Sequence, residues 1–347
     1  MSEHGRIPTL DGWRGIAISM VVVFHLQFTF FNRQVAWWPQ TGETGVTLFF
    51  VLSGFLITSL LIQNQDTLRM FYTRRFFRLM PAAWTYLAFI VLFRLLTHAP
   101  IVSVRAIVAS VFFYRNLLSI QNPEGLATGH FWSLSIEEQF YLLWPPILLT
   151  LPRRWTKWLC GAGILASMTW KLSGVPNGAN ANIFLDGDAL LIGCFLALLT
   201  QKEAILLRFA SLARWLALPA LLTLVWLVAV TSFTFKRSTL EPLSIAILLM
   251  TTTCFSRAWW ARWLEWKPLA TVGRMAYSIY LWQEIFILFY GTWARPIGLL
   301  CIPLFSAASY YWIEQPSIRF GKVLAQRRPV VGYAMEMEVA KAEMHSL

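Results

Sequence analysis

Residues 10–31, LDGWRGIAISMVVVFHLQFTFF, form an apolar stretch long enough to cross a bilayer as one helix, yet the stretch contains Arg14 and His25. Arg14 and His25 are about three helical turns apart, so their side chains lie on nearly the same face of the helix. At about 1.5 Å per residue, they are roughly 16 Å apart along the axis. Ionisable groups at such depth are costly and usually face a polar cavity or a partner. The stretch therefore predicts a membrane helix with a cation low and an imidazole higher on one polar face.

Apolar runs of similar length recur along most of the chain. Hydrophobic residues make up 57% of the 347 residues and charged residues only 13%, whereas soluble domains average about 25% charged residues. This composition predicts an all-α polytopic membrane protein, a bundle of helices surrounded by membrane lipids. The net charge of +12 does not indicate a nucleic-acid partner, because the Lys and Arg residues lie in short loops between apolar runs, as the positive-inside rule expects.

The cysteines and the ends of the chain add little chemistry. The four cysteines are scattered through apolar segments and indicate neither a disulfide framework nor a metal site. The polar residues 1–8 carry no cleavable signal, so the first apolar stretch is expected to act as the insertion signal. We expect one membrane domain over residues 1–320 and a short charged cytoplasmic tail over residues 321–347.

The distribution of positive charge predicts the orientation. With both termini in the cytoplasm, most of the 29 Lys and Arg residues lie inside. Basic stretches at 69–78 and 153–157 both favour the inside, and only an even number of the three apolar segments between them can cross. One of 79–97 and 101–118 is therefore expected to be re-entrant, interfacial or strongly tilted. The ten predicted spans are 10–31, 45–63, 79–97, 131–151, 158–172, 185–200, 215–233, 240–255, 275–290 and 297–314.

The same argument makes the segment that follows His130 run inward from the outer face. Glu137 and Glu138 then fall in the outer half of the membrane, near the expected depth of His25. The sequence thus predicts an outward-facing polar pocket that combines an imidazole with carboxylates. Two alternatives stay open: these carboxylates could form structural ion pairs with Arg105 or Arg115, and an intramembrane histidine is often only a helix–helix hydrogen-bonding residue.

Positive charge gathers at the cytoplasmic side. Arg75 and Arg78 are three residues apart and share a face if that stretch is helical, and Arg14 is also low in its helix. Guanidinium groups bind phosphate oxygens bidentately and remain charged, which suits a cytoplasmic coenzyme with several phosphates. A buried histidine is suited to abstracting a proton from a hydroxyl. A phosphate site below and a base above indicate group transfer across the membrane, although the arginines could simply enforce topology.

Seven motifs, in order, resemble the membrane-bound acyltransferase-3 family, whose multi-span enzymes O-acylate cell-surface sugars and some small glycosylated products. One such motif would be a weak signal, whereas seven in order are highly specific. The motifs are Leu10–Ala17 leading to His25, Gly45–Ile57, Phe71–Arg78 with its Arg-x-x-Arg, Trp132–Tyr141, Asp188–Gly193, Tyr277–Trp282 and Tyr311–Pro316.

The resemblance implies an acyl-CoA donor, expected to be acetyl-CoA, that binds from the cytoplasm without a metal. It also implies an acceptor hydroxyl on a cell-surface polysaccharide or lipid-linked glycan, at the outer face of a bacterial inner membrane. In this family pattern His25 is essential and Glu137 supports the acceptor side. The implied donor-binding residues are Arg14, Arg75 and Arg78.

The chain departs from the family pattern at three positions, which leaves the acceptor open. Thr47 and Gln283 stand where the family often has Asp and His, and Asp186 replaces an Arg that is common there. The acyl group could travel directly to the acceptor or through a covalent intermediate on His25. Two other functions fit some of the same residues: O-acylation of a small glycosylated natural product, and transport or flipping of an anionic or lipid-linked substrate.

Overall fold

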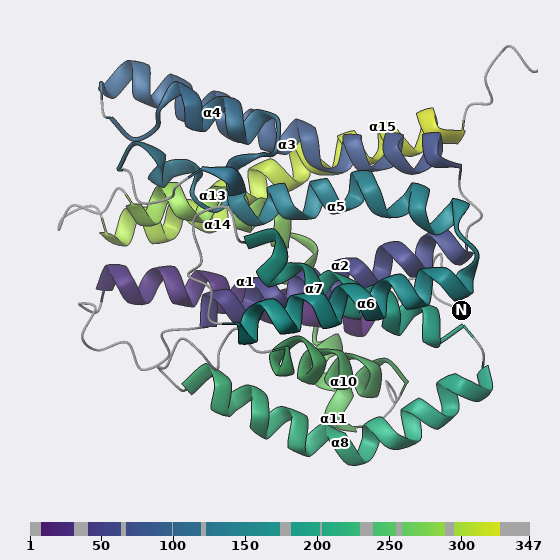
Figure 1. Ribbon diagram of the computed structural model, residues 1–347. Coiled ribbons are helices and arrows are strands. Elements are labelled where there is room, and N and C mark those ends of the chain that lie inside the picture. Colours follow the sequence, from purple (N-terminus) through teal and green to yellow (C-terminus); the bar gives the residue numbers. More distant parts are fainter. Residues whose placement is uncertain are drawn as a thin grey trace, which may run out of the picture.

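The computed structural model of the chain is a bundle of long helices that lie side by side (Figure 1). The described residues form helices and turns and no strand, which confirms the all-α prediction for that part of the chain. They are 8–30, 41–63, 67–98, 100–118, 123–173, 182–201, 203–229, 239–254, 259–288 and 295–326.

The helices follow the apolar runs of the sequence closely. The long helices are α1 (Pro8–Phe30), α2 (Thr41–Gln63), α3 (Leu68–Thr97), α5 (Phe131–Thr150), α6 (Arg153–Leu172), α7 (Asn182–Leu199), α8 (Glu203–Ala229), α10 (Leu240–Cys254), α13 (Ala276–Leu288), α14 (Arg295–Ser309) and α15 (Gln315–Gln326). The short elements are α4 (Val104–Val111), η3 (Arg115–Leu117), η4 (Pro123–Thr128), α11 (Trp259–Arg262), η5 (Trp263–Glu265), α12 (Lys267–Arg274) and the π-helical turn η6 (Tyr310–Glu314).

Among the described residues, three helical stretches are long and apolar enough to cross a membrane: Thr41–Gln63, Leu68–Thr97 and Ile297–Gln326. Shorter apolar helices accompany them, so the structure fits a membrane helical protein. The ten-span count and the cytoplasmic position of both termini stay predictions.

The weakest part of the predicted topology is the region between α3 and α5. Helix α4 has only eight residues, about 12 Å of helix, which is too short to cross a bilayer. One of the segments 79–97 and 101–118 is expected not to cross the membrane, and the short helix identifies 101–118 as that segment. The Arg115 side chain is buried at 1% exposure and donates to the carbonyl oxygens of Leu118 at 3.3 Å and Gly125 at 3.2 Å. These contacts satisfy the buried guanidinium and fold the segment back on itself.

Two helices extend beyond the segments that hydropathy predicts. Helix α3 begins at Leu68, where the Thr67 side chain accepts from the Met70 N–H at 3.3 Å, so the basic stretch 69–78 is helical and not a loop. Helix α15 continues to Gln326 and thus runs through the expected end of the membrane domain at residue 320. Hydropathy underestimates both helices because the first turns of α3 and the turns of α15 carry basic side chains.

Helices α2 and α7 cross with their backbones in close contact, as small residues allow in membrane proteins. A Cβ on Gly54 would lie 2.0 Å from the carbonyl oxygen of Leu190, and a Cβ on Gly193 would lie 2.2 Å from that of Val51. Gly54 and Gly193 therefore let the two helices approach each other closely.

This crossing gives a stability prediction. We expect Gly193→Ala to destabilise the protein by about 1–3 kcal/mol, because the added methyl must push two backbones apart. Thermal unfolding in detergent, followed by size-exclusion fluorescence, measures the change. Gly161→Ala in α6 is the matched control, because a Cβ there meets no atom within 4 Å; equal melting temperatures for the two variants would contradict the packing argument.

Candidate active site

A cavity of about 150 Å³ lies at the centre of the bundle. Its walls come from α1, α2, α3, α5, α12, α13 and the π-helical turn η6, so segments far apart in the sequence meet there. The polar side chains of the wall are Arg14, Ser53, Arg75, Arg78, Ser133, Glu137, Tyr141, Arg274, Tyr277, Tyr280 and Glu314. We call this space the arginine cavity, because four of these side chains are guanidinium groups.

Arg75 is the most constrained of the four arginines. Its Nη2 lies 3.3 Å from Oε1 of Glu137 and its Nε lies 3.7 Å from Oε1 of Glu138. Its guanidinium carbon is 3.5 Å from the centroid of the Tyr141 ring, a cation–π distance. Glu137 also accepts hydrogen bonds from Ser53 at 2.5 Å and from Tyr141. The two carboxylates therefore fix the Arg75 side chain and offset its charge.

The other cavity arginines differ in how far their charges are offset. Arg14 forms an ion pair with Asp11 at 3.4 Å, one helical turn earlier. Arg78 and Arg274 form no ion pair within 4 Å with any residue that the structure describes. Arg274 donates to Thr271 Oγ1 at 2.6 Å. These two guanidinium groups are the cations of the cavity that are best placed to receive an anionic ligand.

His25 lies apart from the arginine cavity, higher in α1. Its Nδ1 is 3.3 Å from Oε1 of Gln283, a fully buried side chain of α13. In the tautomer that carries its proton on Nδ1, the ring donates to this amide oxygen and Nε2 is the basic nitrogen. An imidazole in this tautomer can take a proton from a hydroxyl.

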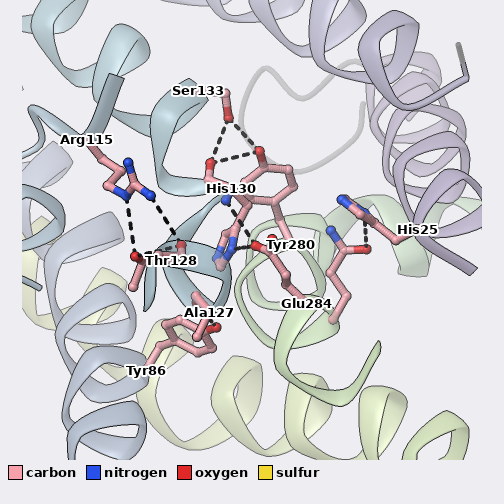
Figure 2. A network of polar contacts seen from close by, with 11 residues as sticks. His25, Tyr86, Arg115, Ala127, Thr128, His130, Ser133, Tyr280 and Glu284 are labelled. Carbon is pink, nitrogen blue, oxygen red and sulfur yellow. Dashed lines mark hydrogen bonds and ion pairs between the residues drawn. The ribbon is translucent and has the colours of Figure 1, made fainter. Parts of the chain in front are cut away.

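A second polar cluster, around His130 and Glu284, lies beside His25 (Figure 2). Glu284 accepts from the backbone N–H of His130 at 3.0 Å and contacts its ring Nδ1. Tyr280 donates to the carbonyl oxygen of His130 at 3.1 Å and hydrogen-bonds Ser133 at 2.5 Å. Since Ser133 and Tyr280 also line the arginine cavity, a chain of polar contacts leads from that cavity to the surroundings of His25.

Comparison with known proteins identifies the family of this chain. The acyltransferase domain family matches residues 7–313, nearly the whole described chain. The chain belongs to the acyltransferase-3 family. No solved structure gives a significant match.

Several curated members of the family are similar to the chain. Peptidoglycan O-acetyltransferase OatA of Listeria monocytogenes is 27% identical over 94% of this chain, and O-acetyltransferase OatA of Staphylococcus aureus is 28% identical over 89%. The putative peptidoglycan O-acetyltransferase YrhL of Bacillus subtilis is 29% identical over 90%. The matches cover 55–57% of these relatives, so the chain spans about half of their length.

The structure brings the three arginines of the family motifs together but separates Glu137 from His25. The sequence places both at similar depth, whereas the Glu137 carboxylate lies against Arg75. Glu137 is separated from His25 because of the depth of His130 in the bundle. His130 is buried at 4% exposure and itself lies near His25. Glu137 is seven residues further along α5, about 10 Å lower. The ion pairs considered with Arg105 or Arg115 are not the ones observed.

Three functional candidates escape the sequence argument. Arg274 is hidden in a basic stretch that topology alone explains, while His130 and Glu284 are ionisable residues within apolar runs, the signal that singled out His25. Asp188, near the start of α7, does not line the arginine cavity. Asp188 forms a buried ion pair with Lys171 at 2.6 Å, and the Asp186 side chain lies outside the described residues.

Proposed function

We propose that this chain is a membrane O-acyltransferase that moves an acetyl group from cytoplasmic acetyl-CoA to a hydroxyl of a cell-surface polysaccharide or glycolipid sugar. The observation that carries the proposal is the cavity with four arginines, from which polar contacts lead to Glu284, the chain neighbour of the Gln283 side chain that contacts His25. Guanidinium groups suit the phosphates of an acyl-CoA, and the imidazole suits activation of an alcohol. The peptidoglycan O-acetyltransferases among the relatives favour a peptidoglycan-like acceptor.

On this proposal the donor binds in the arginine cavity. Arg78 and Arg274 contact its phosphates, because neither has an ion pair with another described residue. Arg14 contributes a partly offset charge at the same wall. Arg75 presents its remaining N–H groups in an orientation that Glu137 fixes, so we assign Glu137 to the donor side.

The proposed chemistry is acyl transfer with His25 as the base. Its Nε2 takes the proton of the acceptor hydroxyl, and the alcohol oxygen attacks the thioester carbonyl. The carbon–sulfur bond then breaks, and the leaving thiolate receives the proton from the imidazolium. A route in which His25 first carries the acyl group uses the same residues, with the alcohol attacking the acyl-imidazole in a second step.

The experiment that tests the function uses the full chain in liposomes. Labelled acetyl-CoA is supplied with soluble peptidoglycan fragments, and both thiol release and the label on the glycan are measured. We expect one thiol released for each acetyl group transferred, and a glycan mass increased by one acetyl unit. Movement of a lipid-linked glycan across the membrane without thiol release would favour the flippase function. Labelling of a small glycosylated product in place of the glycan would favour the natural-product acceptor.

A further inference from the structure

We propose that Glu284, oriented by His130, is the positioning carboxylate that stabilises His25 while this imidazole is protonated. The inference rests on the proposed function and goes beyond it, since it assigns a second ionisable pair to the acceptor-side chemistry. The residues involved come from three helices, with His130 at the start of α5 and Glu284 on α13 beside α1.

The first argument is location. Gln283 and Glu284 are consecutive on α13, and Gln283 accepts from His25 at 3.3 Å. In Figure 2 Glu284 lies between His130 and His25, and the carboxylate interacts electrostatically with both imidazoles. A negative charge in this place favours the cationic form that His25 must adopt when it takes the proton of the acceptor.

The second argument is that Glu284 is fixed in this place. Its carboxylate accepts from the backbone N–H of His130 and contacts the ring Nδ1 of the same residue. Tyr280, one turn earlier on α13, donates to the carbonyl oxygen of His130. Two consecutive turns of α13 therefore contact His130, one at its backbone N–H and the other at its carbonyl oxygen. A carboxylate with such contacts needs little rearrangement when charge develops beside it.

The third argument is charge balance. Glu284 is buried at 9% exposure, and a buried carboxylate needs compensation. Within the described residues its ion-pair partner is His130. The Arg115 guanidinium donates to carbonyl oxygens and also interacts electrostatically with the Glu284 carboxylate. One carboxylate thus serves two imidazoles. A proton that arrives on His25 finds a negative charge already in place.

The other acidic groups near the site have partners of their own. Glu314 accepts from Ser278 at 2.8 Å and interacts electrostatically with Arg78. Glu137 and Glu138 face Arg75, and Asp11 faces Arg14. The Nε2 of His130 forms no hydrogen bond with the described chain, so Glu284 is the observed polar contact of that ring. We therefore assign His130 to the orientation of Glu284 and Glu284 to the orientation and charge of His25.

The test compares Glu284→Gln in two backgrounds, with single-turnover acetyl transfer as the rate and acetyl-CoA affinity as the binding readout. In the otherwise unchanged chain we expect transfer to fall by about 100-fold, with donor affinity changed less than threefold. In a His25→Ala background we expect Glu284→Gln to change the residual transfer less than twofold, because a residue that acts through His25 has nothing left to act on. A purely structural role would lower the rate by the same factor in both backgrounds and would overturn the proposal.

Two further variants keep the test decisive. Glu284→Asp retains the charge, so we expect it to recover at least a tenth of the unchanged chain's rate if charge beside His25 is what matters; a rate as low as that of Glu284→Gln contradicts this role. Glu265→Gln, at an exposed position of η5, is the matched control and should transfer at the normal rate. If the unchanged chain transfers acetyl and Glu284→Gln equals it, only this inference fails. If the unchanged chain releases no thiol from acetyl-CoA, the proposed function fails with it.

Discussion

Replacing His25 with alanine is expected to lower acetyl transfer by about 1000-fold or more while acetyl-CoA binds as before. The imidazole lies outside the arginine cavity, so the donor loses no contact. The acceptor loses its base, a contribution of roughly 100-fold to 10,000-fold in enzymes. Liposomes that contain equal amounts of each protein, supplied with labelled acetyl-CoA and glycan, measure both quantities.

The matched control for this change is His98→Asn. His98 is exposed and caps α3 with a positive φ of 55°, a conformation that asparagine tolerates. This variant should transfer acetyl at the normal rate. Transfer by His25→Ala at more than a tenth of the normal rate would remove the imidazole from the mechanism. Loss of donor binding together with transfer would instead show that His25 supports the fold of the donor site.

The sequence predicts the helices well, because the bilayer directly determines the length of the apolar runs and the distribution of charge between them. The sequence also predicts that three arginines, Arg14, Arg75 and Arg78, lie together at the cytoplasmic side. The structure places them around one cavity. Their convergence follows from simple geometry, since each belongs to a long helix whose direction the loop charges predict. Helical spacing was enough to align Arg75 with Arg78, and their stretch is indeed helical.

The sequence does not predict which carboxylate pairs with which cationic group. Glu137 and Glu284 both lie in apolar surroundings, and nothing in the chain order says which one faces His25. The choice depends on how deep each helix sits, and a shift of seven residues moves a side chain about 10 Å. Burial of His130 at the start of α5 sets that depth. Local periodicity carries no information about the depth of a helix, because this depth is a property of the packed bundle.

Arg274 shows a different limit. Positive-inside topology explains any arginine in a cytoplasmic loop, so a basic residue there carries no functional signal by itself. Only the packing of α12 against α1 brings Arg274 to the cavity. At this contact a Cβ on Gly273 would lie 1.8 Å from the carbonyl oxygen of Asp11. The absence of a side chain at residue 273 thus lets α12 approach α1 closely enough for Arg274 to reach the cavity wall.

The second large effect is expected at the donor site. The double variant Arg78→Ala and Arg274→Ala should weaken acetyl-CoA binding by about 100-fold or more, because each charged hydrogen bond to phosphate contributes about 1.5–3 kcal/mol. The remaining binding should also depend less on ionic strength, since fewer charge contacts are left to screen. Equilibrium binding of labelled acetyl-CoA at two salt concentrations measures both effects. Arg75→Ala is a poorer probe, because it leaves Glu137 and Glu138 without their cation.

Arg69→Ala is the matched control, an exposed arginine on the first turn of the same helix α3. It removes a positive charge from the same end of the helix without touching the cavity. If general positive charge attracts the donor, Arg69→Ala weakens binding as much as Arg78→Ala does. If the cavity binds the phosphates directly, only the cavity variants lose affinity. An unchanged affinity in the double variant would contradict the donor site, because no other pair of cavity arginines lacks an ion pair within 4 Å in the described part of the chain.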